Sequence, residues 1–134
     1  MAQKMNPFPG LRPFEMQEKY LFFGREDQTV ELLKRLVQAR FMAVVGTSGS
    51  GKSSLVRAGL LPELHGGTMT DAGSSWEIAV MRPGGDPLTN LAKSLEESGI
   101  YDTDEDGYYR HLRAMLGRST MGLIEAVSQS TLEK

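Results

Sequence analysis

Residues 41–53 read FMAVVGTSGSGKS, an apolar run that leads directly into a glycine-rich loop. The run Phe41–Val45 is short and continuous and ends in two valines, which is typical of a strand buried on both faces. The loop Gly46–Ser53 matches G-x-x-x-x-G-K-[ST], and a helical pattern resumes at Lys52. Strand, phosphate loop and helix in this order predict an α/β fold: a P-loop NTPase domain with a parallel sheet flanked by helices.

The loop itself predicts an anion site. Its glycines let backbone N–H groups point at a phosphate, and the start of the helix adds its positive end. We expect Lys52 to reach the β- and γ-phosphates of a nucleotide as the candidate catalytic residue, and Ser53 to ligate Mg²⁺. The side chain of Ser54 either contacts the α-phosphate or stays in solvent. The candidate cofactor-binding residues of this loop are Gly46, Thr47, Ser48, Gly49, Ser50, Gly51, Lys52, Ser53 and Ser54.

Hydrophobic periodicity predicts the elements around the loop. Before it, residues 25–40 have apolar side chains at helical spacing, including Val30, Leu33 and Val37. After it, the expected elements are a helix over 52–61 that Pro62 closes, a strand over 76–81, and helices over 86–98, 108–116 and 120–131, the last two separated by Gly117. Asp86 is the expected N-cap of the third helix, with Pro87 as its first residue.

The N-terminal segment is rich in proline and is not expected to be helical. Residues 6–14 read NPFPGLRPF, and three prolines fix extended or turn geometry there. Because Phe8, Leu11 and Phe14 are apolar, we expect this arm to pack against the domain instead of acting as a free linker. The predicted organisation is an extended N-terminal arm over 1–24 followed by the P-loop domain over 25–134.

Composition narrows the class of protein. The chain has 134 residues, a formal net charge of −2 and no cysteine. One globular domain is expected at this length, and thiol chemistry is excluded. The balanced charge gives no sign of a nucleic-acid binder, and no apolar stretch is long enough for a signal peptide or a membrane span. A cytoplasmic protein is the simplest interpretation.

Several motifs together resemble a known family, the novel STAND NTPases, first subclass. The resemblance covers about residues 6–95 and rests on the phosphate loop and on PGLRPF at 9–14, FGRE at 23–26, RAGLLP at 57–62 and MRPG at 81–84. It implies a signalling ATPase in which the nucleotide domain is a switch between sensor repeats and an effector domain. It also implies ATP as the ligand and places Gly24 and Arg25 beside the adenine and ribose.

One expected part of the ATPase machinery is missing from the pattern. Hydrolysis requires an acidic residue at the end of an apolar strand to organise Mg²⁺ and water, and no such strand follows the loop. We therefore expect the N-terminal portion of a larger protein, which binds ATP but hydrolyses it poorly. An unpaired sheet edge in such a portion predicts self-association. Two alternatives remain: an assembly module with an empty P-loop, and a small nucleotide kinase.

Overall fold

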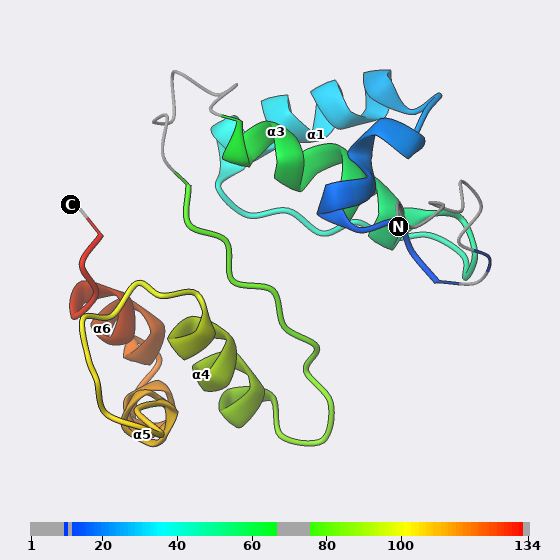
Figure 1. Cartoon of the computed structure of the whole chain (residues 1–134). Coiled ribbons are helices and arrows are strands. Elements are labelled where there is room, and N and C mark those ends of the chain that lie inside the picture. Colours follow the sequence, from blue (N-terminus) through cyan, green and yellow to red (C-terminus); the bar gives the residue numbers. More distant parts are fainter. Residues whose placement is uncertain (1–9, 11, 67–75, 133–134) are drawn as a thin grey trace, which may run out of the picture. The chain divides into compact units, whose positions relative to one another are not determined.

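The computed structural model describes residues 10, 12–66 and 76–132, which form two compact units (Figure 1). The first unit runs from Met1 to Trp76 and the second from Glu77 to Lys134. None of the helices in the described ranges combines the length and the apolar character needed to span a bilayer. The two units are described separately below.

The first unit contains two long helical segments that pack against each other, α1 and the run that begins at Lys52. The 3₁₀ helix η1 (Met16–Leu21) precedes α1 (Glu26–Ala39), so the predicted helix over 25–40 is confirmed. The run after the phosphate loop consists of α2 (Lys52–Ser54), the π-helix η2 (Leu55–Leu60) and α3 (Leu61–His65). The buried hydrophobic residues of this unit lie on that run: Leu55, Ala58, Leu60 and Leu64.

Two details of the first unit differ from the sequence-based expectation. Val30 and Val37 are 48% and 39% exposed, so the predicted apolar stripe of α1 is only partly covered. The helical run also continues through Pro62 to His65 instead of ending before the proline. Pro62 is the second residue of α3, which follows the π-helical stretch ending at Leu60 without a break. A proline inside a helical run removes one backbone hydrogen bond, and here it stands next to the change from π-helical to α-helical geometry.

The predicted parallel sheet is wrong: the described residues contain helices and no strand. The predicted strands over 41–45 and 76–81 lie within stretches that belong to no helix or strand. Phe41 and Val45 are 81% and 86% exposed, so the run that was expected to be buried on both faces is not. The physical reason is that a strand forms only when a neighbouring segment accepts and donates its backbone hydrogen bonds. No segment among the described residues pairs with either stretch.

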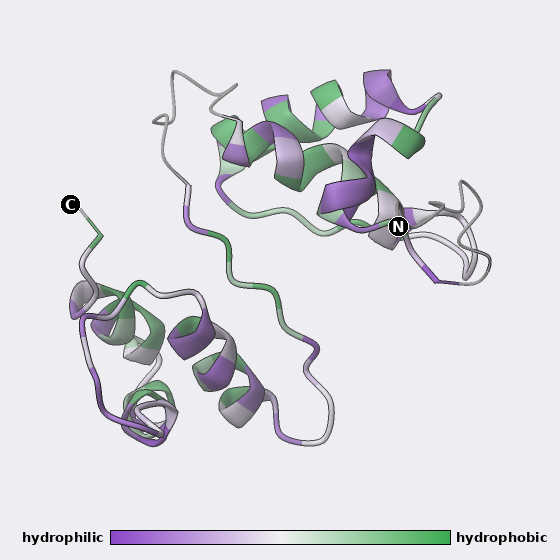
Figure 2. Cartoon of the chain, in the orientation of Figure 1, coloured by the Kyte–Doolittle hydropathy of each residue, from purple (hydrophilic) through white to green (hydrophobic). Residues whose placement is uncertain are grey.

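The second unit is a three-helix arrangement of α4 (Pro87–Glu97), α5 (Tyr109–Arg118) and α6 (Gly122–Ser128). The predicted cap of α4 is confirmed, because the Asp86 carboxylate accepts a hydrogen bond from the Thr89 N–H at 3.2 Å. Figure 2 shows hydrophobic and hydrophilic residues alternating along α4, as expected of a helix with one buried face. The core cluster is Ala92, Leu95, Ile100, Leu112, Met115, Leu116 and Ala126.

The boundary between α5 and α6 differs from the prediction. Gly117 lies inside α5, and the helix ends at Arg118, before the extended residue Ser119. A single glycine lowers helix stability by about 1 kcal/mol but does not end a helix whose buried face packs well. The segment after α6 contacts the loop after α4, because the Thr131 N–H donates to the Ile100 carbonyl oxygen at 2.8 Å.

Candidate functional site

The glycine-rich loop turns sharply between the extended stretch after α1 and the start of α2. Gly49 and Gly51 have φ values of +77° and +83°, a left-handed backbone that glycine adopts without strain. The Ser50 N–H donates to the Thr47 carbonyl oxygen at 3.3 Å, which closes the turn. One of the amides expected to face a phosphate is therefore used inside the loop. Among the described residues, none accepts a hydrogen bond from the amides of Lys52 and Ser53.

The Lys52 side chain folds back onto the loop that precedes it. Its Nζ atom donates to the Thr47 carbonyl oxygen at 2.7 Å and lies 3.5 Å from Ser50 Oγ. A lysine ammonium carries three donors on a flexible stem, so it can exchange a carbonyl partner for a phosphate oxygen by rotating about its side-chain bonds. The loop thus holds the Lys52 ammonium through its own oxygen atoms.

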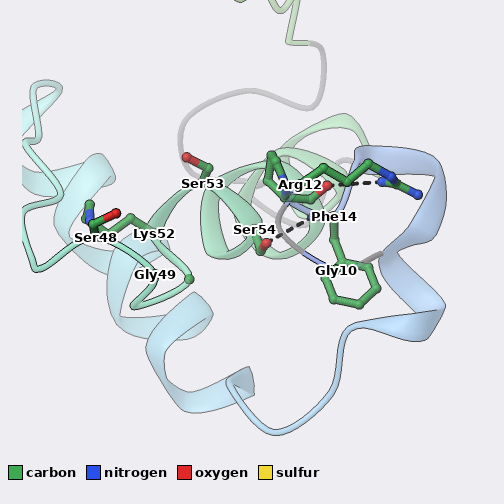
Figure 3. A pocket seen from close by; sticks show the side chains of 10 residues that line it. Gly10, Arg12, Phe14, Ser48, Gly49, Lys52, Ser53 and Ser54 are labelled. Carbon is green, nitrogen blue, oxygen red and sulfur yellow. Dashed lines mark hydrogen bonds between the residues drawn. The ribbon is translucent and has the colours of Figure 1, made fainter. Parts of the chain in front are cut away.

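A cavity of about 640 Å³ adjoins the loop (Figure 3). Six of the predicted site residues line it: Ser48, Gly49, Gly51, Lys52, Ser53 and Ser54. Gly46, Thr47 and Ser50 do not line this cavity. Ser53 is exposed, so its hydroxyl is open to a ligand, whereas Ser54 is buried. Ser54 Oγ accepts a hydrogen bond from the Phe14 N–H at 2.9 Å.

The opposite wall of the cavity comes from residues that motif reasoning missed. Gly10, Arg12, Pro13 and Phe14 line it, and all four belong to the proline-rich N-terminal arm. The described part of this arm contacts the domain, as predicted for Phe14, because the Phe14 N–H donates to Ser54 Oγ at 2.9 Å. Phe8 and Leu11, on which the prediction also rests, lie outside the described residues. The PGLRPF motif ahead of the phosphate loop indicates a family resemblance. Its distance in sequence from that loop does not predict where the motif packs.

Arg25 contacts the phosphate loop directly. Its Nη1 atom donates to the Ser50 carbonyl oxygen at 2.7 Å, and its Nε atom donates to the Gln28 side chain. The preceding Gly24 N–H donates to Glu26 Oε1 at 3.1 Å. The pKa of Glu26 is lowered, first by its own backbone N–H and then by that of Gly24. Neither Gly24 nor Arg25 is among the described residues that line the cavity beside the phosphate loop.

Arg25 instead borders a second cavity of about 470 Å³, between α1, η1 and the helical run. Much of its described lining is apolar or aromatic, and it includes Phe22, Phe23 (75% exposed), Val30, Leu33 and Ala58. Arg25 therefore lies between the phosphate loop and this apolar cavity.

Among the described residues that line the cavity, the side-chain oxygens that could ligate Mg²⁺ are hydroxyl oxygens. Magnesium in nucleotide sites takes one or two protein oxygens, with water and phosphate oxygens in its other positions. Ser53 supplies such an oxygen on the cavity wall. Within the described residues there is no group of three or more His, Cys, Asp or Glu side chains that could hold a metal by themselves.

Comparison with known families gives one match. The family model described as Novel STAND NTPase 1 (nSTAND1) matches residues 7–132, nearly the whole chain. The comparisons with curated proteins and with solved structures gave no match.

Proposed function

The chain belongs to the novel STAND NTPase 1 family, and on that premise we propose that its loop over residues 46–53 binds ATP with Mg²⁺ as a nucleotide switch. The observation that carries this proposal is the cavity of about 640 Å³ on which six residues of the loop and its following helix converge. Among the described lining residues the charged side chains are Arg12, which is paired with Glu18, and Lys52, whose ammonium contacts neutral oxygens of the loop. The uncompensated charge of Lys52 favours an anionic ligand such as a polyphosphate.

Each loop residue has a role in this proposal. The amides of Lys52 and Ser53, at the start of the helical run, donate to phosphate oxygens. Lys52 Nζ leaves the Thr47 carbonyl oxygen, 2.7 Å away, and binds the terminal phosphates as a point charge. Ser53 Oγ holds Mg²⁺, which neutralises charge between the phosphates when bound.

Binding, and not rapid hydrolysis, is the activity that this lining supports. Lysine, arginine and hydroxyl groups hold phosphates, but a P-loop ATPase also positions the attacking water with a carboxylate or an amide side chain. We therefore propose slow turnover, with the nucleotide state read by other parts of a signalling protein.

A thermal-unfolding titration with ATP and Mg²⁺ tests the proposal. A ligand present at a hundred times its dissociation constant stabilises the protein by about 2.7 kcal/mol, and the melting temperature should rise accordingly. Lys52→Ala should lose most of this rise. Lys34→Ala, which removes an exposed lysine from α1, is the matched control and should keep it.

Two outcomes would overturn the proposal in favour of the alternatives. An unchanged melting temperature with every nucleotide tested would favour an assembly module with an empty loop. Formation of ADP from ATP and AMP by the protein would favour a nucleotide kinase.

A further inference from the structure

The N-terminal arm is docked onto the helix that follows the phosphate loop. The Phe14 N–H donates to Ser54 Oγ at 2.9 Å, and Arg57 Nη1 lies 2.6 Å from Glu15 Oε1. Ser54 and Arg57 are three residues apart on one helical run, so they present neighbouring side chains to the arm. The Arg57 side chain is 22% exposed and that of Glu15 is 46% exposed, which makes this ion pair partly buried.

The arm is also braced internally, so that it docks as a shaped segment. The Arg12 guanidinium donates to both oxygens of Glu18, at 2.8 and 2.7 Å. The Glu15 N–H donates to the same carboxylate at 2.9 Å, and the Glu18 N–H donates to the Glu15 carbonyl oxygen at 2.9 Å. These bonds close residues 12–18 into a compact turn at the start of η1.

Docking places this turn on the nucleotide cavity. Arg12, Pro13 and Phe14 form one wall, and Ser54 lies where the arm and the phosphate loop meet (Figure 3). A hydroxyl has one donor and two acceptor positions, so Ser54 can donate to a phosphate while it accepts from Phe14. Hydrogen bonds in such a chain strengthen one another. Occupation of the cavity and docking of the arm thus act on the same hydroxyl group.

We propose that residues 12–15 are a part of the nucleotide site, and that docking of this arm through Ser54 and the Glu15–Arg57 ion pair raises the affinity for ATP and Mg²⁺. The proposal rests on the nucleotide binding proposed above and adds a positioning role for Glu15 and Arg57, which act through the arm. Linkage requires the reverse effect to be equal: the nucleotide must tighten the docked arm by the same factor.

Charge reversal at the ion pair provides the test. Glu15→Lys places two cations together and should release the arm, and ATP with Mg²⁺ should then bind at least about fivefold more weakly by calorimetry. The double variant Glu15→Arg with Arg57→Glu restores an opposite-charge pair and should recover affinity. Glu31→Gln is the matched control, because it removes an ion pair of the same 2.6 Å length on α1, which is absent from the described lining of the cavity, and should bind normally.

Amide hydrogen exchange on the unaltered protein gives an independent readout. The Phe14 N–H should exchange more slowly when ATP and Mg²⁺ are present, by the factor that the affinity change predicts. If the unaltered protein binds nucleotide but Glu15→Lys binds equally well, or if the nucleotide leaves Phe14 exchange unchanged, the role of the arm is refuted while nucleotide binding stands. Absence of binding by the unaltered protein would refute both proposals.

Discussion

Gly51→Ala tests the geometry of the phosphate loop, because this residue combines a left-handed backbone with a crowded neighbour. A Cβ atom at Gly51 would lie 2.7 Å from Arg25 Nη1, closer than real Cβ contacts allow. Gly49 has nearly the same backbone, with φ +77° against +83°, but a Cβ atom there would meet nothing within 4 Å. Gly49→Ala is therefore a matched control that introduces the same backbone strain, also on the cavity wall, without a crowded protein neighbour.

The expected magnitudes follow from these two contacts. A side chain in the left-handed region costs about 1–2 kcal/mol. At Gly51 the new methyl group also displaces Arg25 from the Ser50 carbonyl oxygen, which adds about 1 kcal/mol. Because the loop is largely exposed, it can relieve the strain in the free protein, and the cost then appears as lost affinity. We expect ATP with Mg²⁺ to bind about 5- to 30-fold more weakly to Gly49→Ala and about 30- to 150-fold more weakly to Gly51→Ala.

Titration calorimetry of the variants measures both effects. In an Arg25→Ala background the crowded neighbour is gone, so the loss caused by Gly51→Ala should shrink to that caused by Gly49→Ala. Equal losses for the two glycine variants in the unaltered background would refute the reasoning. So would a difference between them that persists without the Arg25 guanidinium.

Two further predictions concern the arm and the second unit. The pKa of Glu18 is lowered to about 2, first by the Arg12 guanidinium and then by the Glu15 N–H. Since the unfolded value is about 4.3, the ionised carboxylate stabilises the arm above that pH and the contribution is lost as the pH falls toward 2. A carbon NMR titration of the Glu18 carboxyl should have its midpoint near 2. The Arg12→Ala substitution should raise that midpoint. A midpoint in the ordinary range for the unaltered protein would contradict the arm geometry. Leu112 is fully buried, so Leu112→Ala should lower the free energy of unfolding, measured in urea, by about 2–5 kcal/mol. Leu123→Ala, at a 48% exposed position on α6, should change this free energy by less than about 0.5 kcal/mol. Equal effects of the two substitutions would contradict the assigned core.

The helices were predictable because a helix satisfies its hydrogen bonds within its own segment. Periodicity and the Asp86 cap were enough to locate α1 and α4 to within a residue or two. The apolar run over 41–45 carries the same kind of local signal, but a strand depends on a partner that the run itself cannot specify. The sequence therefore predicted a sheet that the described residues do not form.

The residues of the candidate site also fall into two groups, those that local motif spacing predicted and those that only packing brings to the site. Local motif spacing was enough to nominate Lys52, Ser53 and Ser54, and all three line one cavity. The opposite wall could not be read from spacing, because the Phe14 contact with Ser54 joins residues 40 positions apart. The contact between Arg25 and the Ser50 carbonyl oxygen spans 25 positions and has no motif of its own. Long-range contacts of this kind follow from packing, which one sequence does not display.

An amide NMR titration with ATP and Mg²⁺ tests the central claim most directly, because it reports on individual N–H groups of the phosphate loop. If the loop grips the triphosphate, the amide signals of Gly49, Gly51, Lys52 and Ser53 should shift most, together and with one dissociation constant, and Lys52→Ala should abolish the shifts. Signals of these four amides that stay in place at saturating nucleotide would contradict the account.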